Sequence, residues 1–278
     1  MNDDLTPGTL EAYPAHGIIT TEAALLDAWQ GLENYHGNLV LVGGLAVHYH
    51  TKDKAHPIYR ATSTLDVDFG IHIATDGGMR GSVDWDLAML GYRAEPANGR
   101  MAKKLDHGNL YIDFLTEHPP HESGSRNVSD ITASICPGIN RALESRKIIE
   151  VEGTDRFGDA CTFRIPICGI GPLLVLKLNA FAQRTSGKRA KDAYDILVAV
   201  SSYSEGAQAA ITAFHDEATQ SNSAYSGAVK TLETHFLSVD AHGPSKAQQF
   251  RYGHHAPGPE GEQLKADLVH IARTLLRL

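Results

Sequence analysis

Two aspartates stand two positions apart in an apolar stretch, Asp66 and Asp68 in the run Leu65 to Phe69. In a β-strand, residues i and i+2 share a face, so both carboxylates would point to one side and the apolar side chains to the other. Two close carboxylates repel each other unless a cation neutralises them. Mg²⁺ is a hard ion that accepts carboxylate and phosphate oxygens. The spacing therefore predicts a metal site at Asp66 and Asp68, for Mg²⁺ or alternatively Mn²⁺.

A third aspartate, Asp113, lies in a similar apolar run from Leu110 to Leu115. If this run forms a strand beside the first, three carboxylates can hold two metal ions, one for the nucleophile and one for the leaving pyrophosphate. We therefore predict that Asp66, Asp68 and Asp113 are the metal ligands. The alternative is that the aspartate pair lies at an exposed strand edge and that Asp113 caps a turn.

Two adjacent glycines, Gly43 and Gly44, interrupt the apolar run that starts at Leu39. A glycine turn between a strand and a helix lets the backbone approach a phosphate closely, and the first N–H groups of the helix then point at it. The pair predicts a turn that binds nucleotide phosphates. Tight strand-to-helix turns also use glycine for steric reasons alone, and that alternative stays open here.

The order of these parts carries a resemblance to a known superfamily. The parts are, in chain order, Val42-Gly43-Gly44, Asp66-Val67-Asp68 and Asp113. This order resembles the nucleotidyltransferase superfamily that includes DNA polymerase beta and the minimal nucleotidyltransferases. The resemblance implies that the three aspartates bind two Mg²⁺ ions and that the glycine turn holds the phosphates of an NTP. The serine that the superfamily carries after the first glycine is Gly44 in this chain, which removes one hydroxyl from the phosphate site.

A second segment, residues 173–197, resembles the helical part of AbiEii-type nucleotidyltransferase toxins. In those proteins a Lys-x-x-Ala helix with a downstream arginine leads to Lys-Asp-x-x-Asp. The matching residues are Lys177, Ala180, Arg184, Lys191, Asp192 and Asp195. The resemblance implies that nucleotide-binding and catalytic side chains lie here, and it spans residues 35–200 of the chain.

Helical spacing supports a joint role for the charged residues in this segment. Lys191 and Asp195 are four positions apart and share a helix face, as do Lys177 and Arg184, which are seven apart. A lysine held by acids can bind a phosphate, and Asp192 can accept a proton from the attacking hydroxyl. We predict Lys177, Arg184, Lys191 and Asp195 as nucleotide contacts and Lys191 with Asp192 as catalytic residues. The alternative is a ladder of surface ion pairs.

Toxins of this type often carry Arg-x-Thr/Ser-x-Asp before the metal-binding pair. Here Arg60 stands two residues too early, and Thr64 takes the hydroxyl position. The comparison therefore favours Thr64 as a nucleotide contact.

These residues need a sheet and helices to position them. Apolar periodicity predicts strands over 38–42, 65–73 and 109–115 and helices over 20–33, 45–50 and 83–90. The later segments 173–183, 189–200, 207–218, 223–236 and 262–278 are predicted helices, with an exposed loop over 242–261. The sequence thus predicts an α+β fold. A nucleotidyltransferase-type mixed sheet flanked by helices would cover residues 1–165, and an all-helical domain, residues 166–278, would complete the active-site cleft.

Composition sets the class of protein. The chain has 278 residues, 42% of them hydrophobic and 21% charged, which is typical of a soluble globular protein. It shows no apolar run of membrane-spanning length and no signal peptide at its start, so we expect a cytoplasmic protein with no membrane partner. Its three cysteines form no CxxC pair, which argues against a thiolate zinc site. The formal charge of −8 argues against nonspecific coating of nucleic acid but permits local basic groups such as Lys188-Arg189.

The sequence predicts a Mg²⁺-dependent nucleotidyltransferase that moves an NMP from an NTP to an acceptor hydroxyl and releases pyrophosphate. Within the toxin resemblance the acceptor is RNA, such as a tRNA end, and an antitoxin protein is the expected partner. A small-molecule or protein acceptor stays open. So does a catalytically inactive nucleotide-binding or sensor module that keeps the fold.

Overall fold

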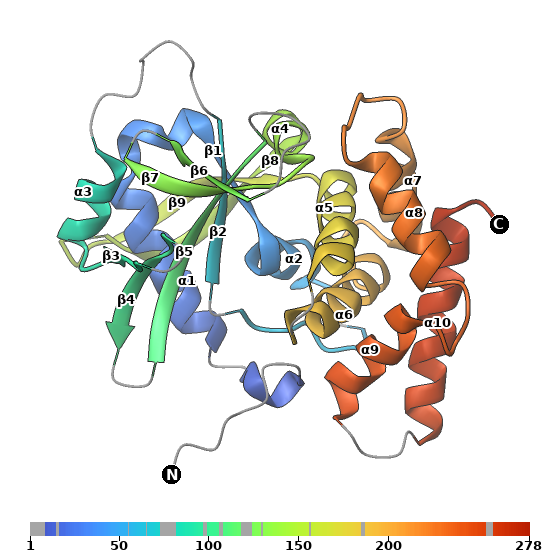
Figure 1. The fold of residues 1–278 in the computed structure, drawn as a ribbon. Helices are drawn as coiled ribbons and strands as arrows, with labels where there is room; N and C mark the ends of the chain where they lie inside the picture. The colour runs from blue at the N-terminus through green and yellow to red at the C-terminus, as the bar shows by residue number, and fades with distance from the viewer. Residues whose placement is uncertain are drawn as a thin grey trace. The chain divides into compact units, whose positions relative to one another are not determined.

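The computed structural model describes residues 9–14, 17–54, 56–64, 66–72, 82–96, 99–105, 108–117, 124–128, 130–155, 157–184, 187–253 and 258–278 (Figure 1). The chain forms two compact units. The first, here called the sheet unit, takes in residues 16–46 and 63–169, and the helical unit takes in 1–15, 47–62 and 170–278. The start of the C-terminal part lies close to the predicted boundary at residue 166. Two earlier segments, however, group with the C-terminal helices.

Specific contacts tie the segment 47–62 to the helical unit. The ring of His50 packs edge-on against the ring of Tyr203, with 5.6 Å between centroids. The backbone N–H of Ser204 donates to the carbonyl of His50 at 2.9 Å. Further along, the hydroxyl of Tyr194 donates to the carbonyl of Arg60 at 3.0 Å. Because these partners are far apart in sequence, no local pattern in the chain reveals the grouping.

The sheet unit is built on one open, mixed sheet, which over the described residues has nine strands. Their order is β3-β4-β5-β2-β1-β9-β8, with β7 paired to β5 and β6 paired to β7. The strands are β1 Leu39–Val42, β2 Asp66–Ile71, β3 Arg93–Ala94, β4 Met101–Leu105, β5 Gly108–Thr116, β6 Ser125–Val128, β7 Ile131–Ile135, β8 Arg146–Thr154 and β9 Ala160–Cys168. Mixed pairing with flanking helices confirms the α+β prediction in its general form.

Strand β2 lies between β1 and β5 (Figure 1). It runs antiparallel to β1 and parallel to β5. Val67 and Phe69 are fully buried, whereas Asp66 and Asp68 are half-buried. This alternation is the one predicted from the sequence, because successive side chains of a strand point to opposite faces.

Helices cover both faces of β2. Helix α1, Gly17–Gly31, packs the ring of Trp29 against that of Phe69, with centroids 6.3 Å apart. On the opposite face, Ile139 of helix α4, Ile139–Glu144, contacts the backbone at Gly70. Helices α2, Gly43–Thr51, and α3, Val83–Met89, confirm two further predicted helices. Short 3-10 helices lie at Leu10–Ala12, in the helical unit, and at Glu33–Asn38.

Over the described residues, the helical unit contains six further helices. They are α5 Ile170–Gln183, α6 Lys188–Ser201, α7 Ala207–Asp216, α8 Tyr225–His235, α9 His242–Tyr252 and α10 Pro259–Leu275. Helix α6 is its centre, since every residue from Ala190 to Val200 is buried. No helix in the described part of the chain is long and apolar enough to cross a membrane.

The predicted exposed loop over 242–261 is wrong for residues 242–252 and for residues 259–261, which belong to α10. Residues 242–252 form α9, which packs against α6 and α10. Its buried residues Pro244, Ala247 and Phe250 recur every third position among polar ones, a sparse apolar stripe. The segment is rich in glycine, histidine and proline, which are typical of loops, and it was therefore predicted as a loop. Residues 254–257 lie outside the described part of the chain.

Candidate active site

The predicted site residues fall into two groups, one in each unit. The first group, here called the carboxylate cluster, consists of Asp66, Asp68 and Asp113 on neighbouring strands of the sheet unit. In the parallel pairing of β2 with β5, Asp68 stands opposite Asp113 and Asp66 opposite Tyr111. Directly paired residues of neighbouring strands share a face of the sheet. The three carboxylates therefore lie together on one face, as the spacing predicted, and Asp113 does not cap a turn.

An arginine that the sequence did not single out pairs with two of these three carboxylates. The Nε of Arg100 donates to Oδ1 of Asp113 at 2.7 Å, and Nη2 donates to Oδ2 of the same carboxylate at 2.7 Å. Nη2 also donates to Oδ1 of Asp66 at 2.9 Å. All three side chains are about one-fifth exposed, at 22%, 20% and 19% for Arg100, Asp113 and Asp66. A two-bond arginine–carboxylate pair of this kind is both strong and directional.

Gly43 lies against the third carboxylate. Strand β1 pairs Val42 with Asp68, and the chain turns into α2 at the next residue, where Gly43 has a φ of +68°. A Cβ atom built on Gly43 would lie 1.9 Å from Oδ2 of Asp68. Only glycine fits, because its backbone conformation disfavours a side chain and the space is already filled by the carboxylate. Gly44 is buried in the first turn of α2.

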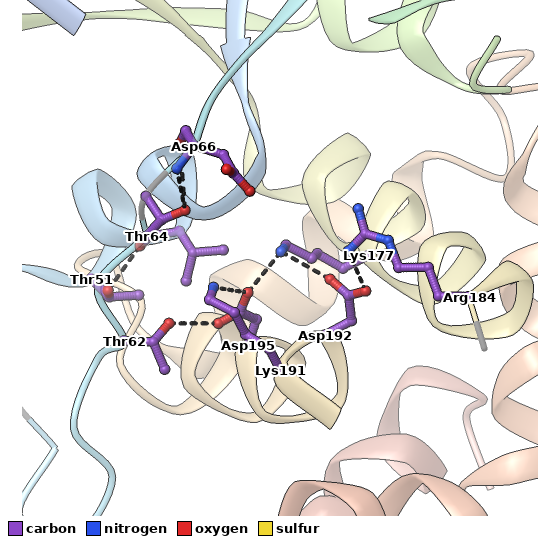
Figure 2. Close-up of polar contacts among 10 residues, drawn as sticks. Thr51, Thr62, Thr64, Asp66, Lys177, Arg184, Lys191, Asp192 and Asp195 are labelled. Carbon is purple, nitrogen blue, oxygen red and sulfur yellow. Dashed lines mark hydrogen bonds and ion pairs between the residues drawn. The ribbon is translucent and has the colours of Figure 1, made fainter. Parts of the chain in front are cut away.

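Thr64 is placed just before the cluster and is buried, at 5% exposure. Its hydroxyl lies 3.4 Å from the backbone nitrogen of Asp66 (Figure 2). Its carbonyl accepts a hydrogen bond of 2.5 Å from the hydroxyl of Thr21. These contacts fix the start of β2. They give Thr64 a structural role in the described arrangement, whereas the nucleotide contact stays a prediction.

The donor set of the carboxylate cluster fits a hard divalent cation. Three carboxylates with one guanidinium leave a formal charge of −2 on these four residues, which one Mg²⁺ balances. As the side chains stand, the position between Asp66 and Asp113 is taken by Arg100. In line with this, the described residues contain no group of three or more His, Cys, Asp and Glu arranged to hold a metal ion. The residue types fit the ion, and Arg100 would have to move for Asp66 and Asp113 to bind it.

The second group, here called the Lys–Asp network, lies in the helical unit on α5 and α6 and contains Lys177, Lys191, Asp192 and Asp195, with Arg184 following α5. Nζ of Lys177 donates to Asp192 at 3.1 Å and to Asp195 at 2.7 Å. Nζ of Lys191 donates to the same Oδ2 of Asp195 at 2.8 Å. Figure 2 shows the lysines of both helices pointing at these carboxylates. The structure thus brings together all five predicted residues of the segment 173–197.

Most of the network is buried, which excludes the alternative of a surface ion-pair ladder. The side chain of Asp195 is 0% exposed, that of Asp192 1%, Lys191 8% and Lys177 9%. Only Arg184, at 42%, reaches solvent while its Nη1 donates to Asp192 at 2.6 Å. Buried charges of this kind persist only when they are paired and hydrogen-bonded.

Asp195 is the acceptor at the centre of the network. Besides the two lysines, the hydroxyl of Thr62 donates to its Oδ1 at 2.8 Å. Burial by itself raises the pKa of Asp195, but the charges of Lys177 and Lys191 outweigh burial and lower the pKa to about 2. The carboxylate is therefore ionised at neutral pH. Like Arg100, Thr62 was not predicted as a site residue.

The two lysines respond differently to the same surroundings. For Lys177, burial favours the neutral amine, but Asp195 and Asp192 outweigh it and raise the pKa above its ordinary value. For Lys191, burial outweighs the attraction of Asp195, and the nearby charge of Lys177 adds to the effect, so that its pKa is lowered. Two carboxylates and three basic side chains leave one positive charge in excess on these five residues. An anion close by would stabilise this excess charge.

No protein-family model matches the chain, and no curated protein sequence is significantly similar to it. The functional interpretation therefore depends on the geometry of the two groups and on the resemblance carried by their motifs.

Proposed function

We propose that the chain is a nucleotidyltransferase that moves an NMP from an NTP to an acceptor hydroxyl and releases pyrophosphate. The observation that carries this proposal is the register of β2 against β5, which sets Asp68 opposite Asp113 with Asp66 on the same face. Carboxylates at these positions, next to a glycine turn at Gly43, are the arrangement that the superfamily motif predicts.

Asp66, Asp68 and Asp113 would hold Mg²⁺, or Mn²⁺ in its place. When bound, such an ion neutralises phosphate charge and favours ionisation of the attacking hydroxyl. The chain's own part is positioning, because the carboxylates stand on two central strands whose apolar faces are packed in the core. At the end of β1, Gly43 leaves room for the carboxylate of Asp68 on the neighbouring strand β2.

In the Lys–Asp network, we assign nucleotide binding to Lys177, Arg184 and Lys191, supported by the excess positive charge. We assign Asp195 a positioning role, because its carboxylate is occupied by two lysines and a threonine. Both oxygens of Asp192 accept hydrogen bonds from cations, Oδ1 from Lys177 and Oδ2 from Arg184. We propose that Asp192 orients these cations, and its role as acceptor of the proton from the attacking hydroxyl stays a prediction.

The proposed acceptor is RNA, with a tRNA end as the favoured site and an antitoxin as partner. Both follow from the toxin resemblance alone. The assay below includes small-molecule and protein acceptors because fold and metal chemistry do not determine the acceptor.

A second candidate, a nucleotide sensor that does not turn over, is favoured by one observation. Arg100 already neutralises part of the cluster without a metal ion. A chain that keeps this pairing in the presence of NTP would bind nucleotide without transferring it.

The test incubates the purified chain with each of the four NTPs, labelled at the α-phosphate, together with Mg²⁺ and total RNA or a cell extract. The comparison is with Asp68→Asn, and Asp84→Asn serves as the matched control because this half-buried aspartate lies on α3, away from β2 and β5 in sequence. We expect label transfer in the wild type and in the control, and its loss in Asp68→Asn. Nucleotide binding with no transfer to any acceptor would contradict the transferase and support the sensor.

A further inference from the structure

Arg100 is placed at the carboxylate cluster by the turn between β3 and β4. The N–H of Glu95 donates to the carbonyl of Arg100 at 2.8 Å, and the N–H of Gly99 donates to that of Glu95 at 2.8 Å. Strand β4 then pairs Met101 with Ile112, which sets the residue before Met101 beside the residue after Ile112. The pairing of β4 with β5 therefore places Arg100 next to Asp113.

The side chain is held on three sides. Two carboxylates accept its hydrogen bonds, and its Cζ lies 4.0 Å from the centroid of the Tyr111 ring. A guanidinium matches a carboxylate through its planar fork, and stacking on an aromatic face adds to the attraction. Arg100 therefore occupies the position that a shared metal ion would need, between Asp66 and Asp113.

A guanidinium and a divalent cation repel each other and compete for the lone pairs of the same carboxylate oxygens. With Arg100 in place, the three aspartates and the arginine carry a formal charge of −2, and without it the aspartates alone carry −3. Removing the arginine thus makes the cluster more attractive to a cation and also takes the competing guanidinium away from Asp66 and Asp113. Both effects act in the same direction.

We infer that Arg100 is a resident counter-ion of the carboxylate cluster, which a divalent metal must displace from Asp66 and Asp113 before the site is loaded. This inference rests on the proposed metal site. Arg100 offsets part of the negative charge of the cluster in the absence of metal, and it weakens metal binding by competition. The released guanidinium remains beside the site, where it can pair with phosphate oxygens.

The experiment measures binding of Mn²⁺ alone to the full chain, by electron paramagnetic resonance of the free ion, for wild type and Arg100→Gln. We expect the dissociation constant to fall about tenfold in Arg100→Gln. Arg93→Gln is the matched control, because the guanidinium of Arg93 donates to the backbone carbonyls of Ala88 and Tyr92 instead of to the three carboxylates of the cluster. Its affinity should equal that of the wild type.

Arg100→Lys keeps the positive charge but loses the two parallel hydrogen bonds of the guanidinium, so its affinity for Mn²⁺ should be higher than that of the wild type and lower than that of Arg100→Gln. It also keeps the test decisive if Arg100→Gln does not fold, as judged by circular dichroism. Equal Mn²⁺ affinity in wild type and Arg100 variants, with binding abolished in Asp68→Asn, would overturn the inference and leave the metal site intact. Absence of Mn²⁺ binding in every variant would overturn the inference and contradict the proposed function as well.

Discussion

Replacing Gly43 with alanine tests whether the glycine turn serves the carboxylate cluster or only the backbone. Gly43 has a φ of +68°, and an added Cβ would lie 1.9 Å from Oδ2 of Asp68. A left-handed backbone costs a residue with a Cβ about 1–2 kcal/mol. In addition, the carboxylate has to move by about 1 Å, a displacement that can reduce a catalytic rate about 100-fold. We therefore expect Gly43→Ala to lose both stability and function.

Gly158 provides the control that separates the two effects. It also has a positive φ, +90°, but nothing lies within 4 Å of the Cβ that alanine would add. Both variants should lower the free energy of unfolding by about 1–2 kcal/mol, measured by urea denaturation. Only Gly43→Ala should also weaken Mn²⁺ binding and label transfer. If Gly43→Ala and Gly158→Ala bind Mn²⁺ equally well, the contact between Gly43 and Asp68 has no part in the site and the reasoning is refuted.

Three further predictions concern the two groups. Asp195→Asn should lower the free energy of unfolding by about 3–5 kcal/mol, because it removes the carboxylate that pairs with the buried lysines. The pKa of Asp195 is lowered to about 2, so its stabilisation is complete above about pH 4 and is lost as the pH falls toward 2. The free energy of unfolding of the variant, measured by urea denaturation, should therefore depend less on pH in this acid range than that of the wild type. Thr62→Val removes one hydrogen bond to Asp195 and should cost about 1 kcal/mol in the same measurement, with the lysine pairs kept. Mn²⁺ at 100 times its dissociation constant should stabilise the wild type by about 2.7 kcal/mol in thermal denaturation, and chelation or Asp68→Asn should abolish the gain.

The part of the fold that carries the aspartates could be predicted from the sequence, because its signals are local. Alternation around Asp66 and Asp68 specifies a strand with one buried face, and β2 has that pattern. Helix α5 likewise follows from a local signal, the helix start at Gly171-Pro172 with helix-forming residues after it, and α6 follows the polar break at residues 185–188. In each case a single segment contains the information.

The long hairpin of β8 and β9 was not predicted, for a physical reason. Most positions of β8, Arg146–Thr154, are exposed, and so is the first half of β9, Ala160–Cys168. A strand with little buried surface is not required to alternate between apolar and polar residues, so its sequence has no clear period. Its pairing partner, rather than a local pattern, determines the conformation.

Arg100 and Thr62 were missed because their roles depend on long-range register. Arg100 reaches Asp113 through the pairing of β4 with β5, and Thr62 reaches Asp195 across 133 positions of sequence. Neither residue belongs to a motif. Acidic residues in apolar runs draw attention because they are costly to bury, whereas the partners that reduce this cost are ordinary polar residues elsewhere in the chain.

The carboxylate cluster and the Lys–Asp network carry net charges of opposite sign. Among their charged residues, the carboxylate cluster has a formal excess of −2 and the Lys–Asp network an excess of +1. A group that served only to stabilise the fold would gain most from internal neutrality, because uncompensated buried charge is costly. In the proposed function, a divalent cation would balance the excess of the first group and a phosphate that of the second.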